Sequence, residues 1–248
     1  MGSVAKMVAS ALGLLICGSA AAQQDLPTVH LTSLEWPPYT GANIDNEGET
    51  TTVVRHALLA MGYRLEVEFF PWKRAVALAQ RPSRFAGYFP EYHSDAVARR
   101  CLLSDSVGSG AIGFAQPRAQ PVKWQTLDDL AAYRIGVVQG YVNSAEFDLR
   151  VAQQKQSVDV ARDDTQNLRK LAAGRIALAV VDQRVFDFLM QNDPQLQPYQ
   201  HQLTFNARPL EIKHLFICFR PTAEGLQLRS LVNAGLRKIQ AGGVRPDR

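Results

Sequence analysis

The chain contains 248 residues, of which 46% are hydrophobic and 20% are charged, and it carries a formal net charge of +4. A chain of this length can bury a substantial core in one large domain or two small ones. Because the charge excess is mild and Lys and Arg are scattered among Asp and Glu, the composition argues against nucleic acid or a membrane surface as a partner.

The first 22 residues have the pattern of a secretory signal peptide. Lys6 supplies the positive end, residues 7–16 form a short apolar core, and Ala20-Ala21-Ala22 gives an A-x-A cleavage site. The apolar core is about half of the ~20 residues that span a bilayer, so we expect no membrane insertion after cleavage. Removal of residues 1–22 takes Lys6 with it and lowers the formal charge from +4 to +3.

After Gln23, short apolar or alternating segments alternate with helix-periodic ones, which is typical of an α/β fold. In the first half of the chain the patterns predict strands at 30–34, 65–69 and 87–89 and helices at 53–61 and 73–79. Gly62 is placed to close the first of these helices.

The segment 116–125 changes character, because Pro117 and Pro121 lie among polar residues, and we expect the chain to cross there between two lobes. A second α/β series follows, with strands predicted at 133–138, 176–181 and 214–219 and an amphipathic helix at 223–240. Asn143 through Glu146 has the spacing of a capping box, and Thr165 is placed to cap a helix that Gly174 closes.

Residues 108–113 fit the G-x-G-x-x-G pattern of dinucleotide sites. That site needs a helix that begins inside the motif, and the prolines at 117 and 121 break any such helix. The five histidines show no metal-ligand spacing, and neither G-x-S-x-G nor a Cys/His nucleophile signature is present. We therefore expect no cofactor and no metal.

The run Glu35-Trp36-Pro37-Pro38-Tyr39 places two aromatic rings and a carboxylate on a stiffened turn after an apolar strand. The prolines fix their own φ angles and restrict the residues before them, so Trp36 and Tyr39 are held in place. The run predicts either the wall of a binding site or a turn whose rings cap the core.

Two later segments, 70–75 and 87–92, lie at strand ends, where open α/β sheets bind ligands. Trp72 is expected to pack under its helix rather than to face a ligand. Arg74 lies in the first turn of the same predicted helix, where a cation opposes the helix dipole, and this makes it a candidate for an anionic group.

A series of short motifs resembles the periplasmic solute-binding proteins of the polar amino acid type, family 3. In chain order the motifs are E-W-P-P-Y-T, F-P-W-K-R-A, G-Y-F-P-E-Y, L-L-S-D-S-V-G, Y-R-I-G-V-V-Q-G-Y, N-L-R-K-L-A-A-G-R-I and A-V-V-D, from about Thr28 to about Gln240. The resemblance implies an α/β fold of type II, with two lobes, a hinge of two crossing strands and a cleft between the lobes. Lobe 1 would comprise 23–111 and 210–248, and lobe 2 would comprise 112–209.

The same resemblance implies roles for particular residues. Trp36 and Tyr39 match the aromatic wall, and Ser94 matches the hydroxyl before the family's carboxylate-binding arginine, whose own place is taken by Val97. Residues 141–144 match a segment that offers hydroxyl and backbone N–H groups at a helix N-terminus. Asp182 matches the carboxylate that holds the amino group of the solute, and it could equally be the N-cap of a helix beginning near residue 183.

The predicted pocket combines an aromatic wall with groups of both charges. Glu35 or Glu91, together with Asp182, would neutralise a cationic group, and Arg74 or Arg118 would meet an anionic one. The full predicted set is Glu35, Trp36, Tyr39, Arg74, Phe89, Glu91, Tyr92, Ser94, Arg118, Tyr141, Asn143 and Asp182. Because the bidentate arginine is missing, an ordinary α-amino acid is not a secure assignment for the ligand.

Cys101 and Cys218 survive leader cleavage, in a compartment that permits disulfides. The residues alone are compatible with a disulfide or with two buried thiols. The resemblance places both cysteines in lobe 1, which favours the disulfide.

The resemblance implies a periplasmic, non-enzymatic monomer that captures a small polar or amphipathic, amino-acid-like solute for an ABC transporter or a sensor. One alternative is an enzyme on the same scaffold, similar to the dehydratases of cyclic acids, with Glu91 desolvated between Phe89 and Tyr92 as the acid/base. Another is an orphan that has lost its solute and serves as an extracytoplasmic interaction module.

Overall fold

The computed structural model describes residues 2 and 26–242. The signal peptide predicted at 1–22 therefore lies outside the described residues, apart from Gly2. None of the described helices is long and apolar enough to cross a membrane.

Helices and strands alternate along the chain, as the sequence predicted. The strands are β1 (Thr28–Ser33), β2 (Arg64–Phe69), β3 (Phe85–Tyr92), β4 (Leu102–Leu103), β5 (Gly108–Pro117), β6 (Ile135–Val138), β7 (Val158–Ala161), β8 (Leu178–Asp182), β9 (Leu203–Phe205) and β10 (Glu211–Phe219). The α-helices are α1 (Glu49–Leu59), α2 (Trp72–Gln80), α3 (Asp95–Ala98), α4 (Ala145–Ala152), α5 (Asp164–Ala172), α6 (Gln183–Asn192) and α7 (Ala223–Ala241). Three short 3-10 helices are η1 (Asp45–Glu47), η2 (Leu127–Leu130) and η3 (Gln197–Tyr199).

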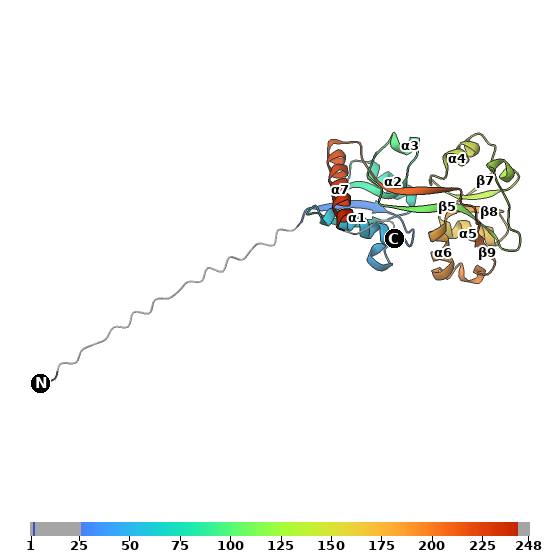
Figure 1. Ribbon diagram of the computed structural model, residues 1–248, viewed down its shortest axis with the longest axis horizontal. Coiled ribbons are helices and arrows are strands. Elements are labelled where there is room, and N and C mark those ends of the chain that lie inside the picture. Colours follow the sequence, from blue (N-terminus) through green and yellow to red (C-terminus); the bar gives the residue numbers. More distant parts are fainter. Residues whose placement is uncertain (1, 3–25, 243–248) are drawn as a thin grey trace.

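The strands form one continuous sheet in the order β2-β1-β3-β10-β5-β8-β6-β7, with β4 added beside β10 and β9 beside β5. Strand β1 runs parallel to β2 and β3, and β6 runs parallel to β7 and β8. Helices α1, α2, α3 and α7 gather at one end of the elongated molecule, and α4, α5 and α6 at the other (Figure 1). We refer to these two ends as the first and the second lobe.

Strands β5 and β10 join the two lobes (Figure 1). Strand β5 pairs with β10 over 108–112 and with β8 over 112–115, so its pairing changes partner at Ile112. The structure thus has the two-lobed α/β fold with two crossing strands. The crossing predicted at 116–125 is wrong, because Pro117 ends β5 inside the second lobe. The lobe boundaries at 111/112 and 209/210 stay a prediction.

The long amphipathic helix and the buried strand after Gly174 are confirmed as α7 and β8. Two predicted caps are wrong. The N-cap of α4 is Ser144, whose hydroxyl accepts a hydrogen bond from Phe147 N (3.2 Å). Likewise α5 is capped by Asp163 instead of Thr165, because the Thr165 hydroxyl donates to the Asp193 carboxylate at 2.7 Å.

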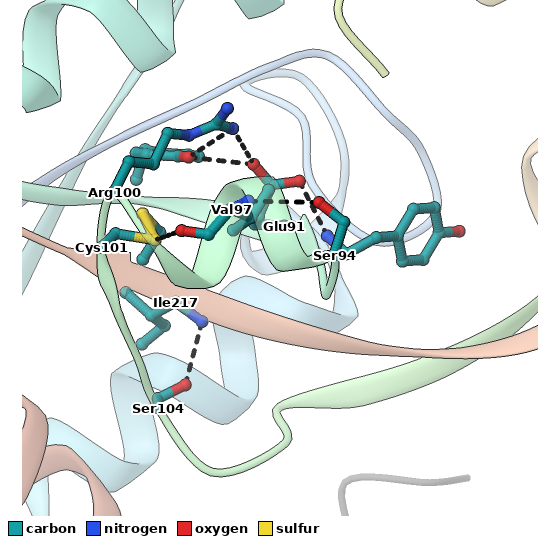
Figure 2. Close-up of a disulfide and its surroundings, with 10 residues drawn as sticks. Glu91, Ser94, Val97, Arg100, Cys101, Ser104 and Ile217 are labelled. Atoms are coloured by element: carbon teal, nitrogen blue, oxygen red, sulfur yellow. Dashed lines mark hydrogen bonds and ion pairs between the residues drawn. A yellow bond between two sulfur atoms is a disulfide. The ribbon is translucent and has the colours of Figure 1, made fainter. Parts of the chain in front are cut away.

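A disulfide joins Cys101 to Cys218 with their Cα atoms 5.5 Å apart, and this answers the question that the sequence left open. It links the segment after α3 to strand β10, two parts of the first lobe separated by 117 positions (Figure 2). The bond therefore fastens β10, which returns from the second lobe, to the N-terminal part of the first lobe.

Candidate functional site

The turn after β1 carries an aromatic cluster that reaches from one lobe to the other. The ring of Trp36 stacks on that of Tyr39 with centroids 4.7 Å apart, and it meets Tyr92 edge-on at 5.9 Å. From the second lobe, Tyr141 packs edge-on against the same indole at 6.5 Å. The turn closes through a hydrogen bond of 2.8 Å from Trp36 N to Thr40 O. The two rings of the turn are buried, and they lie where the two lobes meet.

Asp182 ends β8 and is only 3% exposed. Its Oδ1 accepts hydrogen bonds from Arg184 N (2.9 Å), Val185 N (3.2 Å) and the Tyr39 hydroxyl (3.1 Å). Its Oδ2 accepts one, at 3.4 Å, from the Tyr92 hydroxyl. The carboxylate is thus the N-cap of α6, which confirms that interpretation, and it also accepts from two tyrosines of the opposite lobe. Its contact with the amino group of a solute stays a prediction. Burial raises its pKa to about 6, against the lowering effect of these hydrogen bonds.

Gly110 in β5 explains part of the glycine-rich run. A Cβ atom at this position would lie 2.1 Å from Asp182 Oδ2 and 2.4 Å from the Tyr39 hydroxyl oxygen. That hydroxyl also lies 3.3 Å from the Ser109 carbonyl oxygen. Only a residue without a side chain lets the crossing strand pass this close to the carboxylate.

A second buried carboxylate, Asp164, lies in the first turn of α5. The Tyr141 hydroxyl donates to its Oδ2 at 3.2 Å, and burial raises its pKa to about 7. The indole N–H of Trp36 lies close enough to lower that pKa, yet its geometry falls short of a hydrogen bond. Among residues 26–242 this indole N–H has no hydrogen-bond partner.

Glu91 is also buried, but its carboxylate is fully engaged inside the first lobe. Its Oε2 accepts from the Tyr88 hydroxyl (2.9 Å) and from Arg100 Nη2 (3.0 Å), and its Oε1 accepts from Tyr92 N (2.9 Å). Figure 2 shows Arg100 reaching over to Glu91. Burial raises the pKa of Glu91 to about 7, while the bonds from Tyr88 and Arg100 oppose that rise.

The arginine expected from the resemblance has no substitute at its own position. Val97 is fully buried in the core. Of the two arginines that follow, Arg99 is exposed, and the guanidinium of Arg100 is bonded to Glu91 and Tyr88. Ser94, which precedes this position, caps the short helix α3 by accepting from Val97 N at 3.2 Å.

Three cross-lobe residues were absent from the predicted set. Lys213 in β10 is 6% exposed, donates to Asn143 O at 2.9 Å and lies 5.3 Å from the Tyr92 ring centroid. Trp72 begins α2 and is buried, but its indole N–H donates across the lobes to Gly140 O at 3.0 Å and its side chain borders the cleft, so it does not simply pack under its helix as expected. Arg184 covers the Tyr39 ring, with its guanidinium carbon 5.2 Å from the ring centroid. No short motif marks Lys213 or Arg184, and the motif that contains Trp72 does not show its cross-lobe contact, because each partner comes from a distant part of the chain.

The remaining predicted residues lie outside the aromatic cluster. Glu35, Arg74 and Arg118 are exposed. Arg74 lies over the Phe70 ring at 5.1 Å, and Arg118 donates to a backbone carbonyl oxygen in β9 at 3.3 Å. Phe89 is fully buried in β3, and Asn143 is held by the Asp148 carboxylate.

The cleft contains one very small cavity and one larger pocket. A cavity of about 20 Å³, enough for one water molecule, is bounded by Trp36, Trp72, Glu91, Tyr92 and Tyr141. A second pocket of about 430 Å³ shares the Trp72 and Tyr141 side chains with it and extends past Glu35. In this structure the lobes are therefore packed against each other through aromatic rings.

The chemistry of the cluster favours a positive charge. Two buried carboxylates, Asp164 and Asp182, accept hydrogen bonds there from tyrosine hydroxyls, and a buried carboxylate attracts a cation. Arg184 and Lys213 already cover the ring faces of Tyr39 and Tyr92. Within residues 26–242, no three His, Cys, Asp or Glu side chains are grouped so as to hold a metal ion.

No family model matches the sequence, and no curated protein matches it. Solved structures do resemble it. A histidine kinase sensor domain with similarity to periplasmic binding proteins has a TM-score of 0.75 at 17% identity, over 87% of this chain and 91% of that one. The amino acid ABC transporter substrate-binding protein AbpA from Streptococcus pneumoniae, bound to L-arginine, has a TM-score of 0.70 at 13% identity, over 87% and 90%.

A third structure is the ancestral amino acid-binding protein AncCDT-1, a precursor of cyclohexadienyl dehydratase. Its TM-score is 0.68 at 14% identity, over 87% of this chain and 91% of that one. At these identities the likeness establishes the fold. The chain has the two-lobed fold of the periplasmic binding proteins.

Proposed function

We propose that this chain is an exported, non-enzymatic solute-binding protein of the family 3 type, which works in the periplasm and captures a small cationic solute between its lobes. The observation that carries the proposal is the environment of Asp182. This buried carboxylate accepts hydrogen bonds from the hydroxyls of Tyr39 and Tyr92 in the other lobe. The ring of Tyr39 in turn stacks on that of Trp36.

The hydrogen bonds of Asp182 leave one oxygen for a solute. Oδ1 has three donors, whereas Oδ2 has a single long contact of 3.4 Å with Tyr92. An ammonium or guanidinium N–H that replaced this weak contact would gain a charge-assisted hydrogen bond in a site shielded from water. Opening of the lobes would admit the solute, and closure would bring the rings of Trp36 and Tyr39 against it.

The identity of the cation is constrained by the missing arginine. Arg100 is bound to Glu91, and Arg184 is paired with Glu49 at 2.6 Å, so neither guanidinium is arranged to hold a carboxylate in the cleft. We therefore infer a preference for amines and guanidines, and no strict need for an α-carboxylate. Delivery to an ABC transporter or to a sensor domain is the role we propose for the loaded protein, in keeping with the kinds of protein that share its fold.

A catalytic alternative has one observation in its favour. Glu91 has a pKa raised to about 7 and borders the small cavity in the cleft, as an acid/base catalyst would. Its two oxygens, however, already accept bonds from Tyr88, Tyr92 and Arg100. These contacts favour a structural role, and conversion of a bound solute that is abolished by Glu91→Gln would favour the enzyme.

Thermal unfolding against a panel of solutes tests the proposal. We expect arginine, agmatine or putrescine to raise the midpoint, since a ligand at 100 times its Kd adds about 2.7 kcal/mol of stability. Glutamate and neutral sugars should leave the midpoint unchanged. Asp182→Asn should abolish the shift, whereas Asp45→Asn, which removes an exposed carboxylate in η1, should preserve it. Unchanged midpoints with every cation would contradict the proposal and favour an interaction module.

A further inference from the structure

The first lobe contains a second cavity, separate from the cleft, beside the disulfide. Its volume is about 290 Å³, and its walls include Tyr88, Arg100, Cys101, Cys218, Phe219 and Arg220. None of the residues that line it borders either pocket of the cleft. It is therefore a separate space, although Arg100 in its wall is ion-paired with Glu91, which borders the cleft cavity.

The disulfide brings two arginines to this cavity from distant parts of the chain. Arg100 is the neighbour of Cys101, and Arg220 lies two positions after Cys218. Because the Cα atoms of the two cysteines are 5.5 Å apart, the backbone segments that carry the two guanidinium groups are fixed side by side. Figure 2 shows Arg100 next to the sulfur–sulfur bond.

Arg220 has more hydrogen-bonding capacity than its surroundings use. Its side chain is 14% exposed, and its Nη1 donates to Arg81 O at 2.8 Å. Its ion-pair partner, Glu224, is 3.6 Å away and 67% exposed, so that pair is weak and screened by water. The buried Nε has no hydrogen-bond partner among the described residues, which is costly for a charged donor.

Arg100 also retains donors. A guanidinium has five N–H groups, and within the described residues all the side-chain hydrogen bonds of Arg100 come from Nη2, to Tyr88 and Glu91. Arg100 and Arg220 thus bring two positive charges to the cavity. The carboxylates paired with them are that of Glu91, which is buried, and that of Glu224, which is exposed.

The rest of the wall is apolar. Apart from Gln80 and the hydroxyl of Tyr88, the remaining lining consists of Ala79, Phe219, Pro221 and the disulfide. An inorganic anion would leave this surface uncovered, whereas a carboxylate with a short hydrocarbon end would use both kinds of wall.

We propose that this cavity is a second binding site, which takes a small organic carboxylate with its oxygens between Arg100 and Arg220 and its apolar end against Phe219 and the disulfide. The guanidinium fork matches the two oxygens of a carboxylate, and charge-assisted bonds of this kind are the strongest that such a cavity offers.

An NMR titration of the purified protein with sodium butyrate tests the site. At constant ionic strength, the amide signals of Gln80, Arg100 and Phe219 should shift saturably, and those of Trp36 and Asp182 should stay in place. Acetate should bind more weakly than butyrate, because it lacks the hydrocarbon end, and butylamine should produce no shift. Sulfate that binds as tightly as butyrate, or butyrate shifts no larger than those caused by chloride, would overturn the proposal.

Substitutions supply the matched controls. Arg220→Gln should weaken butyrate about tenfold, the loss expected for one charge-assisted hydrogen bond. Arg64→Gln removes the same charge from an exposed position on β2 and should leave butyrate affinity unchanged. Arg220→Lys keeps the charge without the fork and should give an intermediate affinity, so the test does not depend on one variant. Unaltered affinity in Arg220→Gln would refute the site, and binding of a cation in the cleft should be insensitive to all three changes.

Discussion

Asp164 and Asp182 are buried carboxyl groups that have no basic side chain as a hydrogen-bond partner within residues 26–242, and this sets how stability depends on pH. Burial raises the pKa values of both, to about 7 and about 6, above the ordinary aspartate value of 3.8. Between pH 4 and the raised values, the folded protein holds protons that the unfolded chain has released. These groups therefore favour folding most below pH 4, and that contribution is lost as the pH rises through 6 and 7.

The variant Asp164→Asn isolates one of these contributions. The asparagine does not ionise. The free energy of unfolding of the wild type should therefore fall relative to that of the variant as the pH rises from about 4 to about 7. Urea unfolding of both proteins at a series of pH values measures this difference. A difference that is constant with pH, or that moves in the opposite direction, would contradict the assigned environment of Asp164.

Gly110→Ala tests the close approach of β5 to the site. The new methyl group would collide with Asp182 Oδ2 and the Tyr39 hydroxyl, and overpacking of this kind costs about 1–3 kcal/mol. Gly242→Ala is the control, because its added Cβ would lie no closer than 3.5 Å to any neighbour and φ there is −81°. Equal stability of the two variants in denaturant unfolding would contradict the geometry around Asp182.

At the scale of elements, the disulfide ties β10 to the segment after α3, and the loop it closes is long. Removal of a native disulfide typically costs about 2–5 kcal/mol. We expect a double variant, Cys101→Ser with Cys218→Ser, to unfold at a clearly lower temperature than the oxidised wild type. Reductant should lower the midpoint of the wild type toward that of the double variant and leave the double variant unaffected. A midpoint that neither the substitutions nor the reductant lowers would contradict a structural role for the bond.

Sequence patterns predicted the elements whose periodicity is regular. Helix α7 was predicted almost to its ends, because its apolar face repeats over five turns. Strand β3 was predicted at three residues and has eight, all buried. The pattern around Pro90 and Glu91 did not predict a strand, since neither a proline nor a carboxylate is typical of a buried strand.

The candidate site was predictable only where local stiffness fixed a side chain. Trp36 and Tyr39 stood out because prolines flank them, and both lie in the aromatic cluster. Lys213 and Asp164 gave no local signal, because their partners lie far away in the sequence: Lys213 donates to Asn143 O of the other lobe, and Asp164 accepts from Tyr141. Arg74 and Arg118 were chosen for charge and position, yet both face solvent.

At the scale of the whole molecule, a few polar contacts hold the lobes together. Arg184 Nη2 pairs with Glu49 Oε1 at 2.6 Å, and Trp72 donates across the cleft to Gly140 O at 3.0 Å. Together with the Tyr39 and Tyr92 hydroxyls on Asp182, they fasten the second lobe to the first. Solute entry requires these contacts to break. Because they are few, we expect the closed and open forms to differ little in free energy.

The double variant Glu49→Gln with Trp72→Phe removes two of these contacts and keeps the ring of residue 72. We expect the lobes to open in the absence of solute, which small-angle X-ray scattering would register as a larger radius of gyration than that of the wild type. Glu47→Gln is the control, because Glu47 pairs with Arg55 inside the first lobe. The account of the interface fails if the double variant scatters like the control.

The most direct test of the central claim is calorimetric titration of agmatine into the wild type and into Asp182→Asn at pH 5 and pH 7. A cation binds best when Asp182 is ionised, and the pKa of Asp182 is about 6, so we expect wild-type affinity to rise about tenfold between these pH values. Asp182→Asn should bind more weakly than the wild type at pH 7 and should gain less affinity between the two pH values, because Asp164, with a pKa of about 7, is then the carboxylate of the cluster that still ionises. Binding to Asp182→Asn as tight as to the wild type would contradict a cleft that captures cationic solutes through this carboxylate.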